Sequence, residues 1–89
     1  IKDVSLRLAP VNDADAREML SELRGAKALK GFRGQKPRDV DALARFIVSL
    51  SDFFIHHRLW LSEIEMNPLI VLAEGKGVRA VDVRPVRRD

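Results

Sequence analysis

The sequence predicts an α+β fold in which an antiparallel sheet carries two helices packed on one face, in the order β-α-α-β-β. Apolar and polar residues alternate over residues 3–8, as in a half-buried strand. Apolar residues recur every three or four positions over 40–54, as in an amphipathic helix. Residues 61–83 hold two apolar runs around a polar, glycine-containing stretch, which indicates a β-hairpin. The apolar stripe of each helix must be buried against another apolar surface, and one face of the sheet provides that surface.

The composition is that of one small globular domain. The chain has 89 residues, of which 46% are hydrophobic and 33% charged, so it resembles ordinary folded chains with a small core. It contains no cysteine, which excludes disulfides and thiolate metal sites. The net charge of +3 permits binding to phosphates, nucleic acid or an acidic partner and requires none of them. No apolar run is long enough to span a membrane. Because the chain begins without Met or a signal-peptide pattern, we expect it to be a piece of a longer protein.

The first half of the chain is predicted to contain one strand and one helix. The alternating segment 3–8 ends at Pro10, which cannot donate to a sheet. Asn12 or Asp13 then caps a helix that runs to about Leu23. The residues expected on its buried stripe are Ala16, Met19, Leu20 and Leu23.

The middle of the chain is predicted to be an irregular basic loop followed by a long helix. Residues 26–38 are rich in glycine and basic side chains, and 26–30 are expected to form one helical turn. Asp39 then caps a second helix that continues to about His57. Its apolar stripe consists of Val40, Leu43, Ala44, Ile47, Leu50, Ser51 and Phe54.

The last third of the chain is predicted to fold back on itself as a hairpin. The polar segment 73–77 carries two glycines and should form the turn. The predicted cross-strand pairs are Glu65 with Arg84, Asn67 with Asp82, and Leu69 with Ala80. A register shift of one residue would move Asp82 to the other face, so this arrangement depends on the turn.

Three oxygen-bearing side chains lie in a row on the first strand of the hairpin. Glu63, Glu65 and Asn67 are two residues apart from one another, so in a strand they share one face. Such a row is favourable only if it faces water or a cation, and oxygen ligands suit Mg²⁺, Mn²⁺ or Ca²⁺ rather than zinc. The alternative is that the row is a solvent face and that Asn67 and Pro68 form a turn.

Four motifs in a fixed order resemble one family. They are an R-x-x-P strand end at 6–10, a following helix at 15–20, a G-x-R-G loop at 31–34, and the element SEIEMNPL at 62–69. The chain resembles the end of the ATP-grasp domain of nucleoside-diphosphate-forming acyl-CoA synthetases. That family is similar to succinyl-CoA synthetase β subunits and includes fused protein acetyltransferases. The resemblance covers nearly the whole chain and implies that residues 1–89 are a C-terminal subdomain, half of an ATP-grasp lobe.

The resemblance also implies a set of site residues and cofactors. Asn67 and Asp82 match the positions that hold the Mg²⁺ bridging the phosphates of ATP or ADP, and Glu65 matches a residue that ligates the metal or orients a ligand. Arg33, between two glycines, is a candidate cofactor-binding residue that could reach a phosphate, or it belongs to a solvent loop. Arg7 has the same two alternatives of phosphate binding and a salt bridge.

The expected function is part of an acid–CoA ligase that forms a nucleoside diphosphate, or of the synthetase-like region of an acetyltransferase. The resemblance implies a cytoplasmic enzyme whose partners are the nucleotide and a CoA-binding domain or subunit, and this chain alone should be inactive. His56 and His57 are interpreted as the end of the long helix, where cationic histidine is favourable, and not as a catalytic pair.

Two other interpretations stay open. The basic cluster over 27–38 is also compatible with a small module that binds RNA or an acidic protein, although its aromatic neighbours are not spaced for a stacking sheet. The open face of the sheet could also pair with another subunit or with a second copy of this chain.

Overall fold

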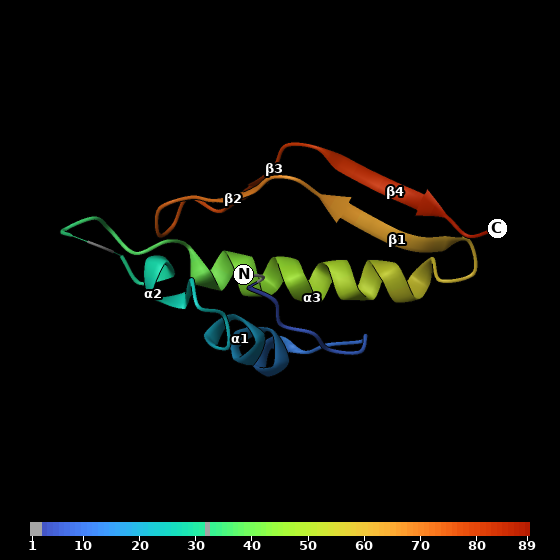
Figure 1. Ribbon diagram of the computed structural model, residues 1–89, viewed down its shortest axis with the longest axis horizontal. Coiled ribbons are helices and arrows are strands. Elements are labelled where there is room, and N and C mark those ends of the chain that lie inside the picture. The colour runs from blue at the N-terminus through green and yellow to red at the C-terminus, as the bar shows by residue number, and fades with distance from the viewer. Residues whose placement is uncertain (1–2, 32) are drawn as a thin grey trace.

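The long helix α3 lies in the middle of the molecule, between α1 on one side and the strands on the other (Figure 1). This arrangement comes from a computed structural model that describes residues 3–31 and 33–89. Its elements are α1 (Asp13–Ser21), α2 (Ala26–Leu29), α3 (Val40–His56), β1 (Leu61–Met66), β2 (Leu69–Val71), β3 (Val78–Ala80) and β4 (Val83–Arg87). The predicted α+β class is confirmed, and both long helices lie on the same side of the strands. Helix α3 lies next to the strands, and α1 packs against the far side of α3.

Helix α1 begins where the sequence predicts, because Asn12 and Asp15 form a reciprocal capping box. The Asn12 side chain accepts from the Asp15 N–H at 2.7 Å, and the Asp15 carboxylate accepts from the Asn12 N–H at 3.0 Å. Ala16 and Leu20 are buried. The predicted cap and buried stripe therefore position α1 correctly, although the helix ends at Ser21.

Helix α3 is held at its start by a buried carboxylate. Asp39 accepts from the Ala42 N–H at 3.1 Å and from the Gly77 N–H at 2.7 Å. These two N–H groups hold the pKa of Asp39 below its ordinary value, because they stabilise the ionised form. Asp39 thus joins the beginning of α3 to the turn between β2 and β3, and Leu43 and Ala44 are buried on the next turn of α3.

The hairpin has the predicted register. Glu65 pairs with Arg84 and Leu69 pairs with Ala80. Between these pairs, the Asn67 N–H donates to the Asp82 carbonyl at 3.0 Å. The turn closes through the Leu72 N–H, which donates to the Gly77 carbonyl at 3.0 Å. The strands form two separate two-stranded ladders, β1–β4 and β2–β3, and the chain passes from one to the other at 67–68 and 81–82.

The predicted strand over residues 3–8 does not form and is corrected here. The segment pairs with no strand in the described part of the chain. Its apolar side chains are the exposed ones: Val4 is 59%, Leu6 80% and Leu8 93% accessible. A strand requires a neighbour that satisfies its N–H and carbonyl groups, and no described strand lies beside this segment. The alternation is present in the sequence, but the side expected to be buried faces outward.

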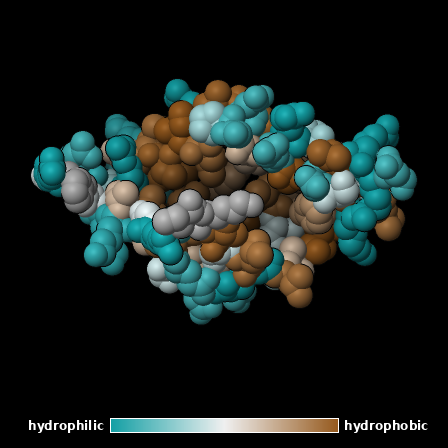
Figure 2. Space-filling view, viewed as in Figure 1, coloured by the Kyte–Doolittle hydropathy of each residue, from teal (hydrophilic) through white to brown (hydrophobic). Residues whose placement is uncertain are grey.

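The described helices are all too short or too polar to cross a membrane. Hydrophobic side chains gather over the middle of the face seen in Figure 2, and hydrophilic ones cover the two ends of the molecule.

Candidate functional site

Asn67 and Asp82 lie opposite each other at the junction of the two ladders. The Asn67 N–H donates to the Asp82 carbonyl at 3.0 Å, and the Val81 N–H donates to the Pro68 carbonyl at 3.1 Å. Both Asn67 and Asp82 are exposed. Residues that are directly opposite in an antiparallel pair point to the same face, so the junction presents an amide and a carboxylate together.

Glu65 and Glu63 continue this polar face along β1. Both are exposed, whereas Ser62, Ile64 and Met66 between and beside them are half-buried. The alternation is that of a strand with one covered face and one open face. The row expected from the sequence therefore faces outward, and Glu65 is opposite Arg84 in the ladder.

The donor set of this face fits a hard divalent cation in part. It consists of carboxylate and amide oxygens, the ligands that Mg²⁺ accepts in proteins. Within the described residues, no three side chains drawn from Asp, Glu, His and Cys gather into a group that could hold a metal ion. The chain thus offers Asn67, Asp82 and Glu65 as candidate ligands, and a complete coordination shell requires oxygens from elsewhere.

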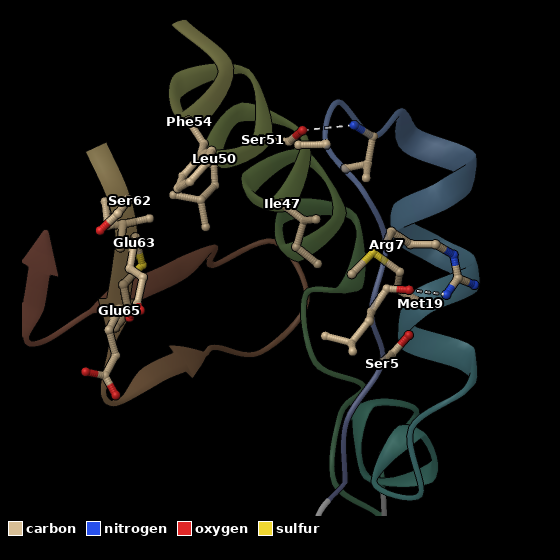
Figure 3. A pocket seen from close by; sticks show the side chains of 15 residues that line it. Ser5, Arg7, Met19, Ile47, Leu50, Ser51, Phe54, Ser62, Glu63 and Glu65 are labelled. Atoms are coloured by element: carbon tan, nitrogen blue, oxygen red, sulfur yellow. Dashed lines mark hydrogen bonds between the residues drawn. The ribbon is translucent and has the colours of Figure 1, made fainter. Parts of the chain in front are cut away.

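Arg7 is engaged in ion pairs with α1. Its guanidinium contacts Glu18 at 2.6 Å and donates to the Glu22 carboxylate at 3.0 Å through Nη1. Ser5 donates to the same Glu22 carboxylate at 2.7 Å. The Arg7 and Ser5 donors lower the pKa of Glu22 to about 2, and the two carboxylates raise the pKa of Arg7. Figure 3 shows Arg7 turned toward α1 and away from β1. The geometry favours the salt-bridge alternative for Arg7.

Arg33 is exposed in a loop that requires glycine. Gly31 has φ +93°, and a Cβ there would lie 2.7 Å from the Gln35 carbonyl oxygen. Arg33 itself has φ 53°, and the adjoining Phe32 lies outside the described residues. The loop is tied to the β2–β3 turn, since the Glu74 N–H donates to the Pro37 carbonyl at 2.9 Å. The turn and the Asn67–Asp82 junction are at opposite ends of the β2–β3 ladder, so the structure does not bring Arg33 to the candidate metal ligands.

The histidine pair lies at the end of α3, as expected. His56 is the last residue of the helix and His57 is its C-cap. The Trp60 indole N–H donates to His57 Nδ1 at 3.0 Å, and the Phe53 ring lies 4.3 Å from the His57 ring, centroid to centroid. His57 is therefore part of an aromatic cluster that holds the connection between α3 and β1.

Sequence reasoning missed the side chains that anchor the N-terminal segment. Asp3 accepts from the Arg24 N–H at 2.6 Å and from the Gly25 N–H at 2.8 Å. Ser51 accepts from the Val11 N–H at 2.9 Å. Ser51 could have been found, because a hydroxyl on the apolar stripe of a helix requires a hydrogen-bond partner. No local pattern points to Asp3.

The chain has the fold of part of an ATP-grasp domain. A family model described as "ATP-grasp domain" matches residues 1–86, and the chain belongs to this family. Within the family it matches the ATP-grasp portion of ADP-forming acyl-CoA ligases. It is 40% identical over 84 residues to the 4-hydroxybutyrate–CoA ligase [ADP-forming] of Nitrosopumilus maritimus.

Solved structures agree with this assignment. A crystal structure of a Pyrococcus horikoshii protein matches 97% of this chain at a TM-score of 0.90 and 30% identity. The dinucleotide-forming acetyl-coenzyme A synthetase 1 of Ca. Korarchaeum cryptofilum, in complex with coenzyme A and Mg-AMPPCP, matches 94% of this chain at a TM-score of 0.86 and 31% identity. These matches do not support the alternative of a small RNA-binding module.

The chain corresponds to a minor part of each of these proteins. Its match covers 94% of this chain and 12% of the Nitrosopumilus maritimus ligase. It covers 36% of the Pyrococcus horikoshii chain and 38% of the Ca. Korarchaeum cryptofilum chain.

Proposed function

We propose that residues 1–89 are the C-terminal subdomain of the ATP-grasp part of an ADP-forming acyl-CoA synthetase and supply one side of its Mg–nucleotide site. The observation that carries the proposal is the Asn67–Asp82 pair, which presents two oxygen donors at an exposed ladder junction. The match to a synthetase that was solved with Mg-AMPPCP supports it.

Asn67 and Asp82 would hold the metal ion through their side-chain oxygens. Glu65, which lies two residues before Asn67 on the exposed face, would ligate the ion or orient one of its ligands. When bound, Mg²⁺ neutralises the charge on the nucleotide phosphates during phosphoryl transfer. The incomplete ligand set agrees with this role, because Mg²⁺ usually takes substrate phosphates and water as its remaining ligands.

The intact protein would interconvert an acyl-CoA, ADP and phosphate with the acid, CoA and ATP in the cytoplasm. This chain would contribute the metal ligands, and the rest of the ATP-grasp domain and a CoA-binding domain or subunit would contribute the remaining groups. The chain alone should be inactive, because those other parts of the enzyme would be needed to complete the site.

The test is a calorimetric titration of the intact ATP-grasp protein with Mg–ADP, together with an assay of its turnover. We expect Asn67→Ala and Asp82→Ala each to weaken Mg–ADP binding by about tenfold or more and to lower turnover. Asp52→Ala is the matched control, because Asp52 is an exposed carboxylate on α3. Wild-type affinity and turnover in both site variants would remove the site assignment.

Repeating the titration with ADP and no divalent cation separates metal ligation from direct contact with the nucleotide. Loss of affinity at Asn67 and Asp82 should appear only when Mg²⁺ is present. Arg33→Ala is proposed to weaken binding with and without the metal, because a guanidinium pairs with phosphate oxygens directly.

A further inference from the structure

The connection between α3 and β1 is fixed by backbone hydrogen bonds. The His57 carbonyl accepts from the Trp60 N–H at 3.1 Å and from the Leu61 N–H at 2.9 Å. The Trp60 carbonyl accepts from the Arg88 N–H at 2.6 Å, which joins the connection to the segment after β4. Figure 1 shows the C-terminus next to this connection. The backbone of Trp60 is therefore held through both its N–H and its carbonyl.

The side chains of His57 and Trp60 meet through a hydrogen bond of their own. The Trp60 indole N–H donates to His57 Nδ1 at 3.0 Å. Because an indole nitrogen can only donate, His57 Nδ1 is the acceptor, and the proton of the neutral imidazole lies on Nε2. A charged imidazole carries a proton on both nitrogens and accepts no hydrogen bond. The contact therefore exists only while His57 is neutral.

Aromatic rings surround the His57 imidazole. The ring centroid of Phe53 lies 4.3 Å from that of His57, and the Trp60 centroid lies 5.4 Å from it. The His56 ring lies 4.8 Å away on the same end of α3. The Trp60 ring stands at 74° to the imidazole, edge to face. Ring contacts of this kind are weaker than burial of the whole ring, so the indole hydrogen bond sets the position of Trp60 against His57.

Charged groups near His57 act in opposite directions. Arg58 follows it in the chain, and the Arg88 guanidinium donates to the Arg58 carbonyl at 3.1 Å. These two cations disfavour a charged His57, whereas the carbonyl end of α3 favours it. Within the described part of the chain, His57 forms no ion pair with a carboxylate. The carboxylates nearest to the connection along the chain are all exposed: Asp52, Glu63 and Asp89. No acidic partner therefore fixes His57 in its charged form.

We propose that His57 and Trp60 form a pH-sensitive switch at the connection between α3 and β1. Histidine gains its proton as the pH falls from about 8 to 5. The proton on Nδ1 turns the acceptor into a donor, the indole loses its partner, and the ring turns away while its backbone stays in place. Trp60 is 41% and Leu59 87% exposed, so the released indole enlarges an apolar surface at this end of the molecule. The inference does not use the metal ligands, so either proposal can fail while the other stands.

The test is a pH titration of the intact ATP-grasp protein, with isotope-labelled tryptophan observed by NMR. Trp60 is the only tryptophan of this chain, and Trp60→Phe identifies its signal by removing it. We expect the indole N–H signal of Trp60 to follow one titration curve between about pH 8 and pH 5. Its solvent exchange, corrected for pH, should be at least about tenfold faster at the acid end. A Trp60 signal that does not respond to pH in the folded protein would overturn the proposal.

The carboxylates that hold the fold together do not interfere with this titration. Asp3, Glu22 and Asp39 have lowered pKa values, so they remain ionised over the whole range. A change in the Trp60 signal between about pH 8 and pH 5 therefore points to a histidine.

Substitutions separate His57 from the neighbouring histidine. His57→Asn keeps an oxygen that accepts from the indole and does not titrate, so the pH response of the Trp60 signal should disappear. His57→Phe keeps a ring beside Phe53 and offers no acceptor, so the indole should exchange fast at every pH. Either variant decides the question alone if the other does not fold.

His56→Asn is the matched control, because His56 is exposed and its removal leaves the hydrogen bond between His57 and Trp60 intact. The Trp60 titration should persist in this variant. A titration that disappears in His56→Asn and persists in His57→Asn would overturn the proposal, because His56 would then be the group that responds to pH.

Discussion

At the scale of single residues, ion pairs and side-chain hydrogen bonds attach the N-terminal segment to α1, and no described strand pairs with it. Arg7 contacts the carboxylates of Glu18 in α1 and of Glu22, the C-cap of α1, and Ser5 adds a second donor to Glu22. These bonds turn the polar side chains of the segment toward α1, which leaves Leu6 and Leu8 outward. The same contacts favour the salt-bridge alternative for Arg7 over the phosphate-binding alternative.

The Glu22 contacts predict a specific pH dependence. The pKa of Glu22 is about 2 in the folded chain, below its ordinary value of 4.5. A lowered pKa stabilises the fold above the ordinary value, and this stabilisation is lost as the pH falls from about 4.5 toward 2. Melting temperatures measured across this window should therefore converge for the wild type and Glu22→Gln at the acid end and differ at neutral pH, with the variant lower.

Glu74→Gln is the control for this measurement, because Glu74 is exposed in the β2–β3 turn and its side chain makes no hydrogen bond in the described part of the chain. Asp3 and Asp39 also have lowered pKa values and remain in every variant. A constant gap between Glu22→Gln and the wild type from neutral to acid pH would show that the ionised contact does not stabilise the fold.

At the scale of elements, the helix caps and the hairpin register could be predicted, because each is determined by residues close together in the sequence. Asp39 caps the helix it was expected to cap, and Asn12 is the cap among the two candidates predicted for the first helix, because a cap depends on residues within one turn. The hairpin register followed from the position of its glycine turn. The strand predicted over 3–8 does not form. A strand depends on a partner strand, which local alternation does not reveal, and no described strand lies beside this segment. The Asp39 bond to Gly77 and the two Asp3 bonds join distant positions, and no local spacing reveals them.

Two glycines in the loop before α3 should differ in the stability that the protein loses when each is replaced by alanine. Gly31 and Gly34 have φ values of +93° and +80°, so alanine at either position meets a left-handed penalty of about 1–2 kcal/mol. Only at Gly31 does the added Cβ also meet a backbone atom, the Gln35 oxygen at 2.7 Å, whereas nothing lies within 4 Å at Gly34. We expect Gly31→Ala to melt below Gly34→Ala by about 4–8 °C for each additional kcal/mol. Equal melting temperatures would mean that the loop relaxes around the new methyl group.

At the scale of the whole molecule, the chain has a thin core for its length. Its buried apolar residues among those described are Val11, Ala16, Leu20, Leu43, Ala44 and Leu61. The radius of gyration is 13.8 Å, above the roughly 12 Å of a compact domain of this length. The shape is elongated, with extents of 48 × 28 × 24 Å. Such a molecule buries little apolar surface. Little hydrophobic free energy is therefore available to offset the conformational entropy that the chain loses on folding.

The isolated chain should consequently be weakly stable. We expect its free energy of unfolding to fall below the range of about 5–15 kcal/mol that is usual for folded domains. Urea unfolding followed by circular dichroism measures this value. An isolated chain that unfolds within the usual range would contradict this account of its core.

The Asp39 bridge has a consequence for the order in which the molecule comes apart. Its bond to the Gly77 N–H spans 38 residues, so it exists only after the hairpin has docked on α3. Because a long loop must close before this contact can form, we expect it to form late on the way to the native state and to be among the first to break. It therefore acts on the lifetime of the docked hairpin more than on the speed of docking. The Asp39 carboxylate is thus expected to slow the separation of the β2–β3 turn from α3.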